Sequence, residues 1–411
     1  MKIIADLHIH SKYSRGCSRE LTLENISKWC QYKGINVVST GDFTHPVWFK
    51  EIKEKLEPAE AGLYKLKNDI SPTRFIIGTE ISCIYTQGGK CRRIHLCLMA
   101  PQISDAEKLI EELTKRGCNL KSDGRPIIGL SAKELARIAW EINADFFVFP
   151  AHVWTPWFAV FGSKSGFNSL LECFEELTGR IFAIETGLSS DPAMNRRLSQ
   201  LDSLALISNS DAHSLANLGR EANVFNLSEI SFNNLISAIK NKQPDNFLYT
   251  IEFFPEEGKY HIDGHAVCNY SCSPEQSKKN NNLCPQCGKP LILGVLNRVQ
   301  ELSDQAESKI KNLVPFKSII PLQEIIADYL SVGKASKKVQ ALYFSLVSRH
   351  PEFEILIDQP LEKLQEIMEK ELSELIMKAR RGELEIIPGY DGVFGRISIK
   401  NPAGQQQEKV F

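Results

Sequence analysis

The sequence predicts an α/β fold over residues 1–250, followed by a zinc ribbon at 251–290 and a mainly helical domain at 291–411. Three observations lead to this prediction. Short apolar runs alternate with amphipathic segments of helical length, four cysteines stand at metal-binding spacings, and apolar residues recur with helical periodicity near the C-terminus. A chain of 411 residues also exceeds the usual size of one domain, so we expect two or three.

Seven apolar runs in the first part of the chain have the length and composition of β-strands. They are Lys2–Ala5, Asn36–Thr40, Arg74–Gly78, Ile94–Met99, Phe146–Pro150, Ile181–Ile184 and Leu204–Ser208. Between them lie helical stretches, of which Thr22 and Ser131 are placed to cap two: Leu21–Lys33, Ser104–Arg116, Ser131–Asn143 and Phe167–Thr178. This alternation is typical of parallel strands joined by crossover helices, and it predicts a β/α barrel.

Histidine and carboxylate side chains lie in or just after these runs. They fall in the segments Asp6–Ser11, Gly41–His45, Gly78–Glu80, Ile94–Leu96, Ala151–Trp154, Glu185–Gly187 and Asn209–His213. Because the carboxyl ends of parallel barrel strands converge on one mouth, we expect these side chains to meet there. A single histidine is more often structural, but six of the nine histidines lie in these segments, which predicts a centre with several metal ions.

The residue types favour particular ions. Mixed imidazole and carboxylate ligands suit zinc, manganese or iron, and a bridging carboxylate holds two ions about 3.5–4 Å apart. His8 and His10 stand two residues apart on an extended segment, so their side chains face the same way, and Asp211 and His213 repeat that spacing. We expect Asp6 to orient one of the ligand histidines.

The segments Asp6–Ser11, Gly78–Glu80 and Ser210–His213, together with His95 and His152, resemble the motifs of the PHP (polymerase and histidinol phosphatase) superfamily. The resemblance implies a distorted seven-stranded β/α barrel that hydrolyses phosphoesters with two or three divalent ions (Zn, Mn or Mg). It also implies that Glu80 bridges two ions and that the following residues bind metal: His8, His10, Glu80, His95, His152, Asp211 and His213. Five of them are expected to carry the catalysis: His8, His10, Glu80, Asp211 and His213.

Two positions depart from the motifs of many relatives. Phe43 follows Asp42 where a histidine is common, so we expect His45 or Asp42 itself to take that ligand position. Arg15 and Gly16 stand where some relatives have a further histidine, which leaves the third ion with the fewest candidate ligands. Glu185 is expected to support a ligand rather than to bind an ion.

A second metal site is expected after the barrel. Cys268-x3-Cys272 and Cys284-x2-Cys287 have the spacing of a four-cysteine zinc ribbon. Four thiolates leave no open coordination position, so this zinc should be structural and should order a segment too short for its own core. The other seven of the eleven cysteines are scattered through the barrel elements and are interpreted as small buried apolar residues.

The helical tail extends the resemblance to the whole chain. A PHP barrel joined to a zinc ribbon, a helical domain and the turn Gly389–Gly392 resembles the endonuclease Q family. That resemblance implies a DNA repair endonuclease that cuts on the 5′ side of uracil, hypoxanthine and xanthine and at abasic sites, leaving a 3′-hydroxyl and a 5′-phosphate. The helical domain is then a DNA-binding or accessory domain, and replication or repair proteins are candidate partners.

Residues 154–166 follow ligand His152 and combine aromatic, basic and glycine residues. We expect this segment to hold a base turned out of the duplex, because aromatic rings stack on bases; a hydrophobic lid packed on the barrel rim is the alternative. The expected substrate-binding residues are Trp154, Trp157, Phe161 and Lys164, with Lys12 and Arg15 contacting phosphate.

The bulk properties narrow the remaining choices. The formal net charge of −1 gives no support to a general nucleic-acid coat, and no apolar run reaches membrane-spanning length. The N-terminus has no signal-like segment and the cysteines show no disulfide framework, so a cytoplasmic protein without membrane contact is expected. A small-molecule phosphatase of the histidinol-phosphate type and a non-catalytic module of a polymerase or helicase remain the alternative functions.

Overall fold

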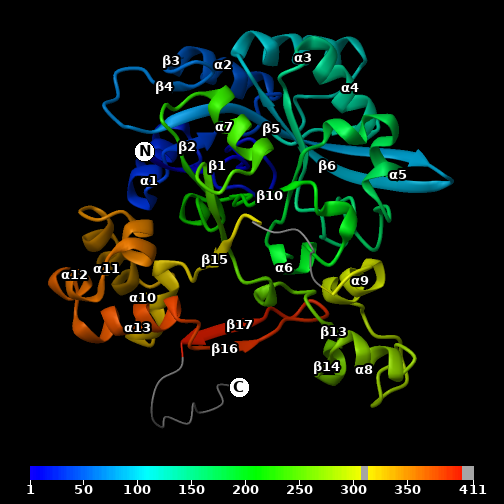
Figure 1. Cartoon of the computed structure of the whole chain (residues 1–411), viewed down its shortest axis with the longest axis vertical. Helices are drawn as coiled ribbons and strands as arrows, with labels where there is room; N and C mark the ends of the chain where they lie inside the picture. The colour runs from blue at the N-terminus through cyan, green and yellow to red at the C-terminus, as the bar shows by residue number, and fades with distance from the viewer. Residues whose placement is uncertain (307–312, 400–411) are drawn as a thin grey trace.

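The computed structural model describes residues 1–306 and 313–399 (Figure 1). Its largest sheet has eleven strands in the described residues. Eight of them follow the spatial order β15 (Phe316–Ser318), β12 (Phe247–Glu252), β11 (Ala222–Asn226), β1 (Lys2–Asp6), β2 (Val37–Ser39), β5 (Arg74–Gln87), β4 (Tyr64–Leu66) and β3 (Leu56–Pro58). β6 (Lys90–Ala100) and β7 (Ile127–Ile128) pair with β5, and β8 (Phe147–Pro150) pairs with β6. β9 (Ala183–Glu185) and β10 (Ala205–Ile207) form a separate parallel pair that continues from β8.

All seven predicted strands are present, but their directions differ in one place from the prediction. β1, β2 and β5 run parallel, as do β9 and β10, whereas β6 runs antiparallel to both β5 and β8. The physical reason is the connection: only Gly88 and Gly89 separate β5 from β6, and two residues can join antiparallel strands but cannot form a crossover. The all-parallel prediction is therefore wrong at this hairpin, and the barrel is distorted.

Three of the four predicted helices match α1 (Leu23–Lys33), α3 (Ile103–Lys115) and α4 (Ala132–Ile142). Thr22 and Ser131 cap α1 and α4 by accepting backbone N–H groups through their hydroxyl oxygens, as expected. The fourth stretch divides into α5 (Leu170–Phe174) and a 3-10 segment (Glu175–Arg180), because Glu175 has φ 48°. The remaining barrel helices are α2 (Pro46–Lys55), α6 (Pro192–Asn195) and α7 (Phe232–Asn241).

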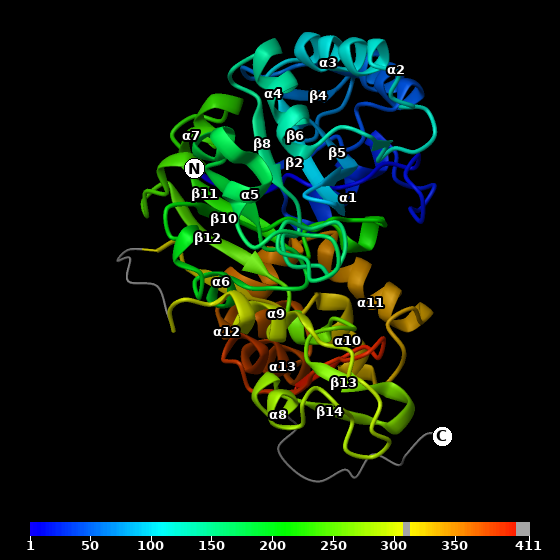
Figure 2. The ribbon, with the colours of Figure 1, turned by 90° about the vertical axis from the view of Figure 1, so that its right-hand side faces the viewer.

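The C-terminal part lies below the barrel in Figures 1 and 2. The ribbon contains the hairpin of β13 (Asp263–His265) and β14 (Tyr270–Cys272) and the helix α8 (Pro274–Lys279), and α9 (Val295–Leu302) follows the ribbon in the chain. Across from it lie α10 (Leu322–Leu330), α11 (Lys337–Val347), a π-helical turn (Glu354–Asp358), α12 (Leu361–Ile367) and α13 (Lys370–Arg380). The hairpin of β16 (Leu384–Ile387) and β17 (Arg396–Ile399) runs between the two groups (Figure 1).

Two contacts join the C-terminal part firmly to the barrel. β15 pairs in parallel with β12, which itself crosses the expected domain boundary at residue 250. Lys33 of α1 forms an ion pair of 2.7 Å with Glu352, and each side chain is only 3% exposed. The hydroxyl of Tyr343 donates to the same carboxylate. No helix among the described residues is both long and apolar enough to cross a membrane.

Candidate metal centre and substrate pocket

Side chains from five barrel segments meet at the strand ends. Two groups of potential ligand atoms form among the described residues: His8, His10, Glu80 and Asp211 in one, and Glu80, His95 and His152 in the other. His8 and His10 follow β1, Glu80 and His95 lie on the β5–β6 hairpin, His152 follows β8, and Asp211 follows β10. The antiparallel hairpin thus contributes to both groups, and Glu80 belongs to both.

The two oxygens of Glu80 face different groups. Oε1 lies 2.7 Å from His95 Nδ1 and 3.1 Å from His152 Nε2. Oε2 lies 3.3 Å from His10 Nε2 and 3.6 Å from His8 Nε2. This division is the geometry required of a carboxylate that bridges two ions.

Three candidate ligand histidines are held in place through Nδ1, the ring nitrogen that does not face the centre. His8 Nδ1 lies 3.0 Å from Glu185, His10 Nδ1 lies 2.9 Å from Asp42, and His152 Nδ1 lies 3.0 Å from the hydroxyl of Thr155. Such bonds select the tautomer that leaves the second nitrogen free for a metal ion.

Glu185 therefore orients a ligand histidine, the supporting role that was expected of it and also of Asp6. The carboxylate of Asp6 instead accepts the backbone N–H groups of Ser210 and Gly219, each at 3.0 Å. Asp6 orients the loop that carries Asp211 rather than a histidine ring, because its side chain is used by these two backbone donors. The expectation for Asp6 is corrected accordingly.

Three potential ligand atoms of the centre make no hydrogen bond in the described part of the chain and could bind a metal ion. His8 Nε2, His10 Nε2 and Asp211 Oδ1 are buried and make no hydrogen bond within the described residues, although Asp211 Oδ1 lies 3.0 Å from His10 Nε2 and 3.7 Å from His8 Nε2. A buried polar atom without a partner is costly, and cation binding would satisfy all three. Two histidines and two carboxylates in one group, and two histidines and the shared carboxylate in the other, are ligand sets that suit divalent transition metals.

The electrostatics of the centre also favour cations. Burial opposes ionisation of Glu80, but the neighbouring charges of His8 and Arg125 hold the pKa of its carboxyl well below the usual value. Burial would lower the pKa of His10, yet the Asp42 carboxylate outweighs it and raises that pKa. The negative field that draws a proton to His10 also draws a metal cation. Burial lowers the pKa of His95 to about 4, so this ring is neutral and ready to act as a ligand.

Backbone strain is concentrated at the same place. Asp42, His152 and Asp211 have φ values of 51°, 30° and 45°, in the left-handed region that non-glycine residues seldom adopt. Gly187 also has a positive φ of 62°, and a Cβ there would stand 2.5 Å from the Cβ of His152. Only glycine therefore allows the loop after β9 to approach His152 this closely.

Three predicted ligands lie outside both groups. His213 packs edge-on against His10, with 4.7 Å between ring centroids, and its Nδ1 lies 2.8 Å from the Asp211 carbonyl oxygen. Asp42 is engaged by His10, and His45 caps the first turn of α2 through Nδ1 and stacks on Tyr13. These contacts engage the Asp42 carboxylate and one ring nitrogen of His45, and neither residue belongs to either group. A third ion at Asp42 or His45 stays a prediction.

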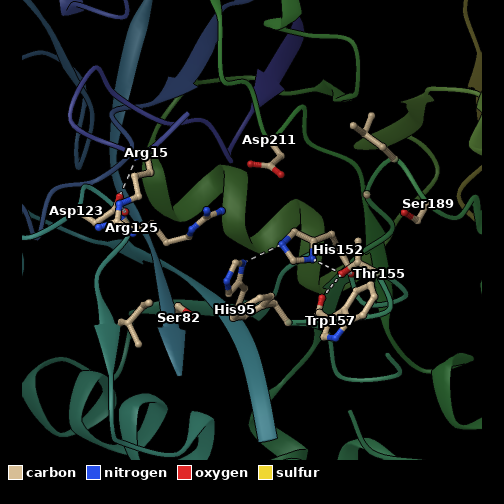
Figure 3. A pocket seen from close by; sticks show the side chains of 14 residues that line it. Arg15, Ser82, His95, Asp123, Arg125, His152, Thr155, Trp157, Ser189 and Asp211 are labelled. Carbon is tan, nitrogen blue, oxygen red and sulfur yellow. Dashed lines mark hydrogen bonds and ion pairs between the residues drawn. The ribbon is translucent and has the colours of Figure 1, made fainter. Parts of the chain in front are cut away.

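A pocket of about 450 Å³ opens over the centre (Figure 3). His95, His152 and Asp211 form part of its wall, and Trp157 lies across from Arg15 in the same pocket. Trp157 is 42% exposed, so its ring is free to receive a flat partner. Ligand side chains and an aromatic face thus share one cavity.

The other two aromatic residues proposed for substrate binding are buried. Trp154 is 1% exposed, its indole N–H donates to Asn195 Oδ1 at 2.7 Å, and its ring packs on Phe161. Phe161 is fully buried. Both residues form the packed base of the segment after β8, because residues 151–154 and 159–162 are buried while residues 155–158 between them are not. The lid alternative is correct for these two residues, and Trp157 alone of the three is available for stacking.

Of the basic residues expected to contact the substrate, one lines the pocket and two do not. Arg15 lines the pocket, with its side chain 85% exposed. Lys12 forms an ion pair of 2.9 Å with Glu51 and lies over the ring of Tyr13, outside the pocket wall. Lys164 is exposed on the loop but does not line the pocket either. The structure therefore favours Arg15 and gives no support to Lys12 or Lys164.

Three pocket residues carry no signal in the sequence. Ser82 lies on β5 two residues beyond Glu80, and Asp123 and Arg125 lie on the turn before β7. The run Asp123-Gly124-Arg125-Pro126 has the composition of an ordinary turn. Arg125 on that turn lies 45 residues from Glu80 in the sequence, and only the folded chain brings the two side chains into contact.

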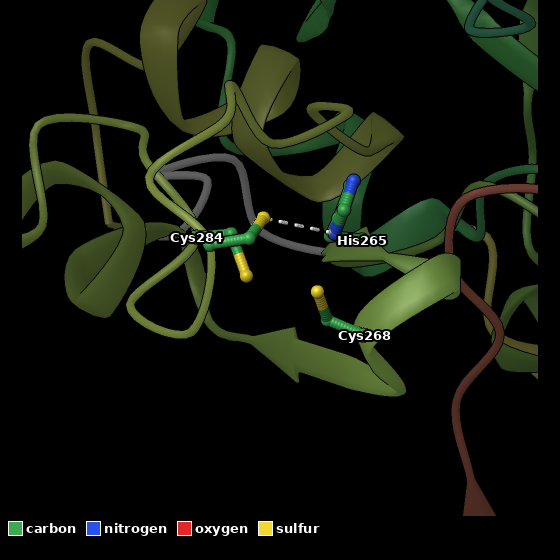
Figure 4. A group of neighbouring side chains, drawn as sticks. His265, Cys268 and Cys284 are labelled. Atoms are coloured by element: carbon green, nitrogen blue, oxygen red, sulfur yellow. Dashed lines mark hydrogen bonds between the residues drawn. The ribbon is translucent and has the colours of Figure 1, made fainter.

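The ribbon gathers a second kind of ligand set (Figure 4). His265, Cys268, Cys284 and Cys287 bring their ligand atoms together, with Cys287 Sγ 3.7 Å from His265 Nδ1. Three thiols and one imidazole form a closed set of four, as in structural zinc sites. The predicted ribbon is present with a cluster of four candidate metal ligands, one of which differs from the prediction.

Cys272 is not a member of this group. In the β13–β14 hairpin, His265 pairs with Tyr270 while Cys272 pairs with Asp263, two residues further from the turn that carries Cys268. Side chains on one strand face recur every two residues, so Cys272 lies on the same face as His265 but about 7 Å further along. The sequence signal that was available for His265 is its His-x2-Cys spacing to Cys268.

Comparison with known proteins agrees with this architecture. The sequence matches the family described as PHP-associated at residues 194–244 and the MJ0043 C-terminal domain at residues 321–383. It is 34% identical over 254 residues to the uncharacterized protein MJ0043 of Methanocaldococcus jannaschii, covering 60% of this chain but only 31% of that protein. It is 28% identical to the uncharacterized protein YqxK of Bacillus subtilis over 96% of this chain and 99% of that protein.

Two crystal structures resemble the whole chain. The lesion-specific endonuclease PfuEndoQ from Pyrococcus furiosus has a TM-score of 0.86 and 31% identity, covering 97% of this chain and 96% of that one. An endonuclease Q bound to a 27-mer duplex with an abasic lesion has a TM-score of 0.85 and 32% identity, covering 97% of each chain.

The distorted barrel with a shared carboxylate at its strand ends defines a metal-dependent phosphoesterase of the PHP superfamily. Similarity along nearly the full length of both crystal structures narrows this class further. The chain belongs to the endonuclease Q family of metal-dependent DNA repair endonucleases.

Proposed function

We propose that this protein incises DNA on the 5′ side of uracil, hypoxanthine and xanthine and at abasic sites, leaving a 3′-hydroxyl and a 5′-phosphate. The observation that carries the proposal is the pocket, whose wall combines metal-ligand side chains with the exposed ring of Trp157. A cavity of this kind can hold one base turned out of the duplex beside the phosphate to be cut. The relative bound to a duplex with an abasic lesion supports DNA as the substrate.

We assign one divalent ion to His8, His10, Glu80 and Asp211 and a second to Glu80, His95 and His152, with zinc, manganese or magnesium as candidates. When bound, such ions lower the pKa of a water molecule and stabilise negative charge on the phosphate oxygens. The protein contributes the fixed positions of the ligands: Glu185 and Asp42 hold the rings of His8 and His10 so that each presents Nε2 to the centre.

Substrate selection is assigned to the pocket wall. Turning a base out of the stack costs a few kcal/mol, about the size of one base–aromatic contact of 1–3 kcal/mol, so stacking on Trp157 can offset the cost. A deaminated base is mispaired with its partner, which makes it easier to extrude than an intact pair. Arg15 at the rim is suited to contact the backbone phosphate. The zinc assigned to His265, Cys268, Cys284 and Cys287 has no open position and is structural.

The test compares three substrates at one salt concentration: a uracil-containing duplex, the matched undamaged duplex and a phosphomonoester such as 4-nitrophenyl phosphate. We expect incision of the first substrate alone, with Asp211→Asn as the inactive control. Faster turnover of the phosphomonoester would favour the histidinol-phosphate type of activity instead.

The cut position is read from the same reaction. A 5′-labelled strand should give a fragment that ends one nucleotide before the lesion and that a DNA polymerase can extend, because extension requires a 3′-hydroxyl. A fragment that needs phosphatase treatment before extension would contradict the proposed polarity of cleavage.

A further inference from the structure

Arg125 is a half-buried cation in the pocket to which the proposed function assigns no role. Its side chain is 24% exposed, and its Nη1 donates to Glu80 Oε2 at 3.2 Å. Asp211 and His95 line the same pocket (Figure 3). Burial opposes the charge, but Glu80 and Asp211 raise the pKa of Arg125, so the guanidinium remains charged at every pH of interest.

The backbone at Arg125 is held independently of the ion pair with Glu80. Asp123 Oδ1 accepts the backbone N–H groups of Arg15 and Arg125 at 3.1 and 3.2 Å. The N–H of Gly124 donates to the Tyr13 carbonyl at 3.0 Å, and the Pro126 carbonyl accepts from the N–H of Ser82 at the same distance. The turn is thus fastened to the segment after β1 and to β5, which fixes the backbone from which the Arg125 side chain reaches the centre.

The guanidinium has more donors than Glu80 can use. Arginine carries five N–H groups in a planar fork, and the described hydrogen bonds of the Arg125 side chain use one of them. If Glu80 bridges two ions, both of its oxygens are engaged by metal, and a guanidinium beside it needs another anionic acceptor. The geometry of the fork matches a phosphate.

We propose that Arg125 is a catalytic residue that donates hydrogen bonds to a non-bridging oxygen of the scissile phosphate; this inference rests on the proposed function. In the reaction a water oxygen bonds to phosphorus and the bond from phosphorus to the 3′ oxygen breaks. That oxygen leaves with the electron pair and takes one proton of the water, and the other proton goes to solvent. The phosphoryl group gains negative charge in the transition state, and Arg125 stabilises that added charge.

The test uses the full-length, metal-loaded protein with Arg125→Ala and Arg125→Lys. Arg74→Ala is the matched control. Arg74 is the first residue of β5, forms an ion pair of 2.7 Å with Glu60, and has a side chain that is 21% exposed. It does not line the pocket. We measure kcat and KM on the uracil-containing duplex, the metal content per chain and the rescue of activity by free guanidinium ion.

For Arg125→Ala we expect kcat to fall about a hundredfold, as for loss of one preorganised donor to a developing anion. Metal content should equal that of the wild type, and guanidinium should restore part of kcat. Arg125→Lys should lie between the two, because it keeps the charge and loses the fork. Arg74→Ala should match the wild type in kcat and metal content.

Two outcomes would overturn the inference. Loss of metal in Arg125→Ala would make Arg125 a support for Glu80, and an unchanged kcat with no guanidinium rescue would remove it from the reaction. If the wild type fails to incise the uracil duplex, the proposed substrate is wrong, and Arg125 is then judged by the same criteria on bis(4-nitrophenyl) phosphate, a phosphodiester without a base.

Discussion

Trp154 and Trp157 lie three residues apart, yet burial separates them, which makes them a matched pair for testing base recognition. Trp157 is 42% exposed in the pocket, whereas Trp154 is 1% exposed and bonded to Asn195. Trp157→Ala removes a stacking face with a contribution of about 1–3 kcal/mol per base, so kcat/KM on uracil- and hypoxanthine-containing DNA should fall about tenfold to a hundredfold. An abasic site has no base to stack, and cleavage there should fall less.

The effect of Trp154→Ala should appear in stability instead. Truncating a fully buried tryptophan lowers the free energy of unfolding by about 3–5 kcal/mol, with a further loss from the unpaired Asn195 amide oxygen. The measurements are denaturant unfolding and kcat/KM for both variants on uracil, hypoxanthine and abasic duplexes at one salt concentration, together with metal content, which should not change. Equal losses by Trp157→Ala on all three substrates would refute the stacking role and make this ring part of the lid.

Three further predictions concern the metal centre, the ribbon and the barrel interior. Asp211→Asn should reduce turnover more than tenfold, over 1.4 kcal/mol of transition-state stabilisation, while circular dichroism shows a folded chain, since asparagine tolerates the φ of 45° at this position; activity above a tenth of wild type would remove Asp211 from the centre. His265→Ala should lower the zinc bound per ribbon and Cys272→Ser should not, and the opposite result in metal analysis would favour the four-cysteine site. Burial raises the pKa of Glu252 from 4.5 to about 8, so the folded protein retains a proton that the unfolded chain releases. Wild-type stability should therefore fall as the pH rises from 4.5 to about 8, by up to about 1.4 kcal/mol per pH unit from this group. Glu252→Gln should weaken that slope in denaturant unfolding at pH 5.5 and pH 8, and identical slopes in both proteins would contradict the assignment.

Much of the metal centre is predictable because its ligands lie close to strands. His8, His10, Glu80, His152 and Asp211 each lie at or just beyond a strand end or on an extended segment, and strands are recognisable from local composition. The convergence of strand ends is a general property of barrels, so these residues could be grouped without coordinates. The ribbon is predictable for a similar reason, since zinc ligands recur at short spacings along the chain.

Residues whose role depends on burial could not be assigned in this way. Trp154 and Trp157 belong to one aromatic run, and nothing in their local sequence states which ring faces the core. His45 resembles a ligand in sequence, but Pro46 starts a helix directly after it, and the imidazole is used as the cap of that helix. The burial of Trp154 follows from packing against residues distant in the chain, whereas the role of His45 follows from a local hydrogen bond with the backbone N–H of Trp48.

By itself, the sequence predicted the seven strands, two capped helices and the cysteine-rich ribbon, because periodicity, caps and short spacings are local properties. Most of the candidate ligand residues came from the resemblance of short motifs to those of the PHP superfamily. Only the tertiary structure decided that β6 turns back on β5, that Glu185 rather than Asp6 holds His8, and that Arg125 lies against Glu80. Each of these contacts depends on which side chains or strands lie close together in the folded chain. Local sequence preferences do not encode that proximity, which is set by how the strands pair and the loops pack.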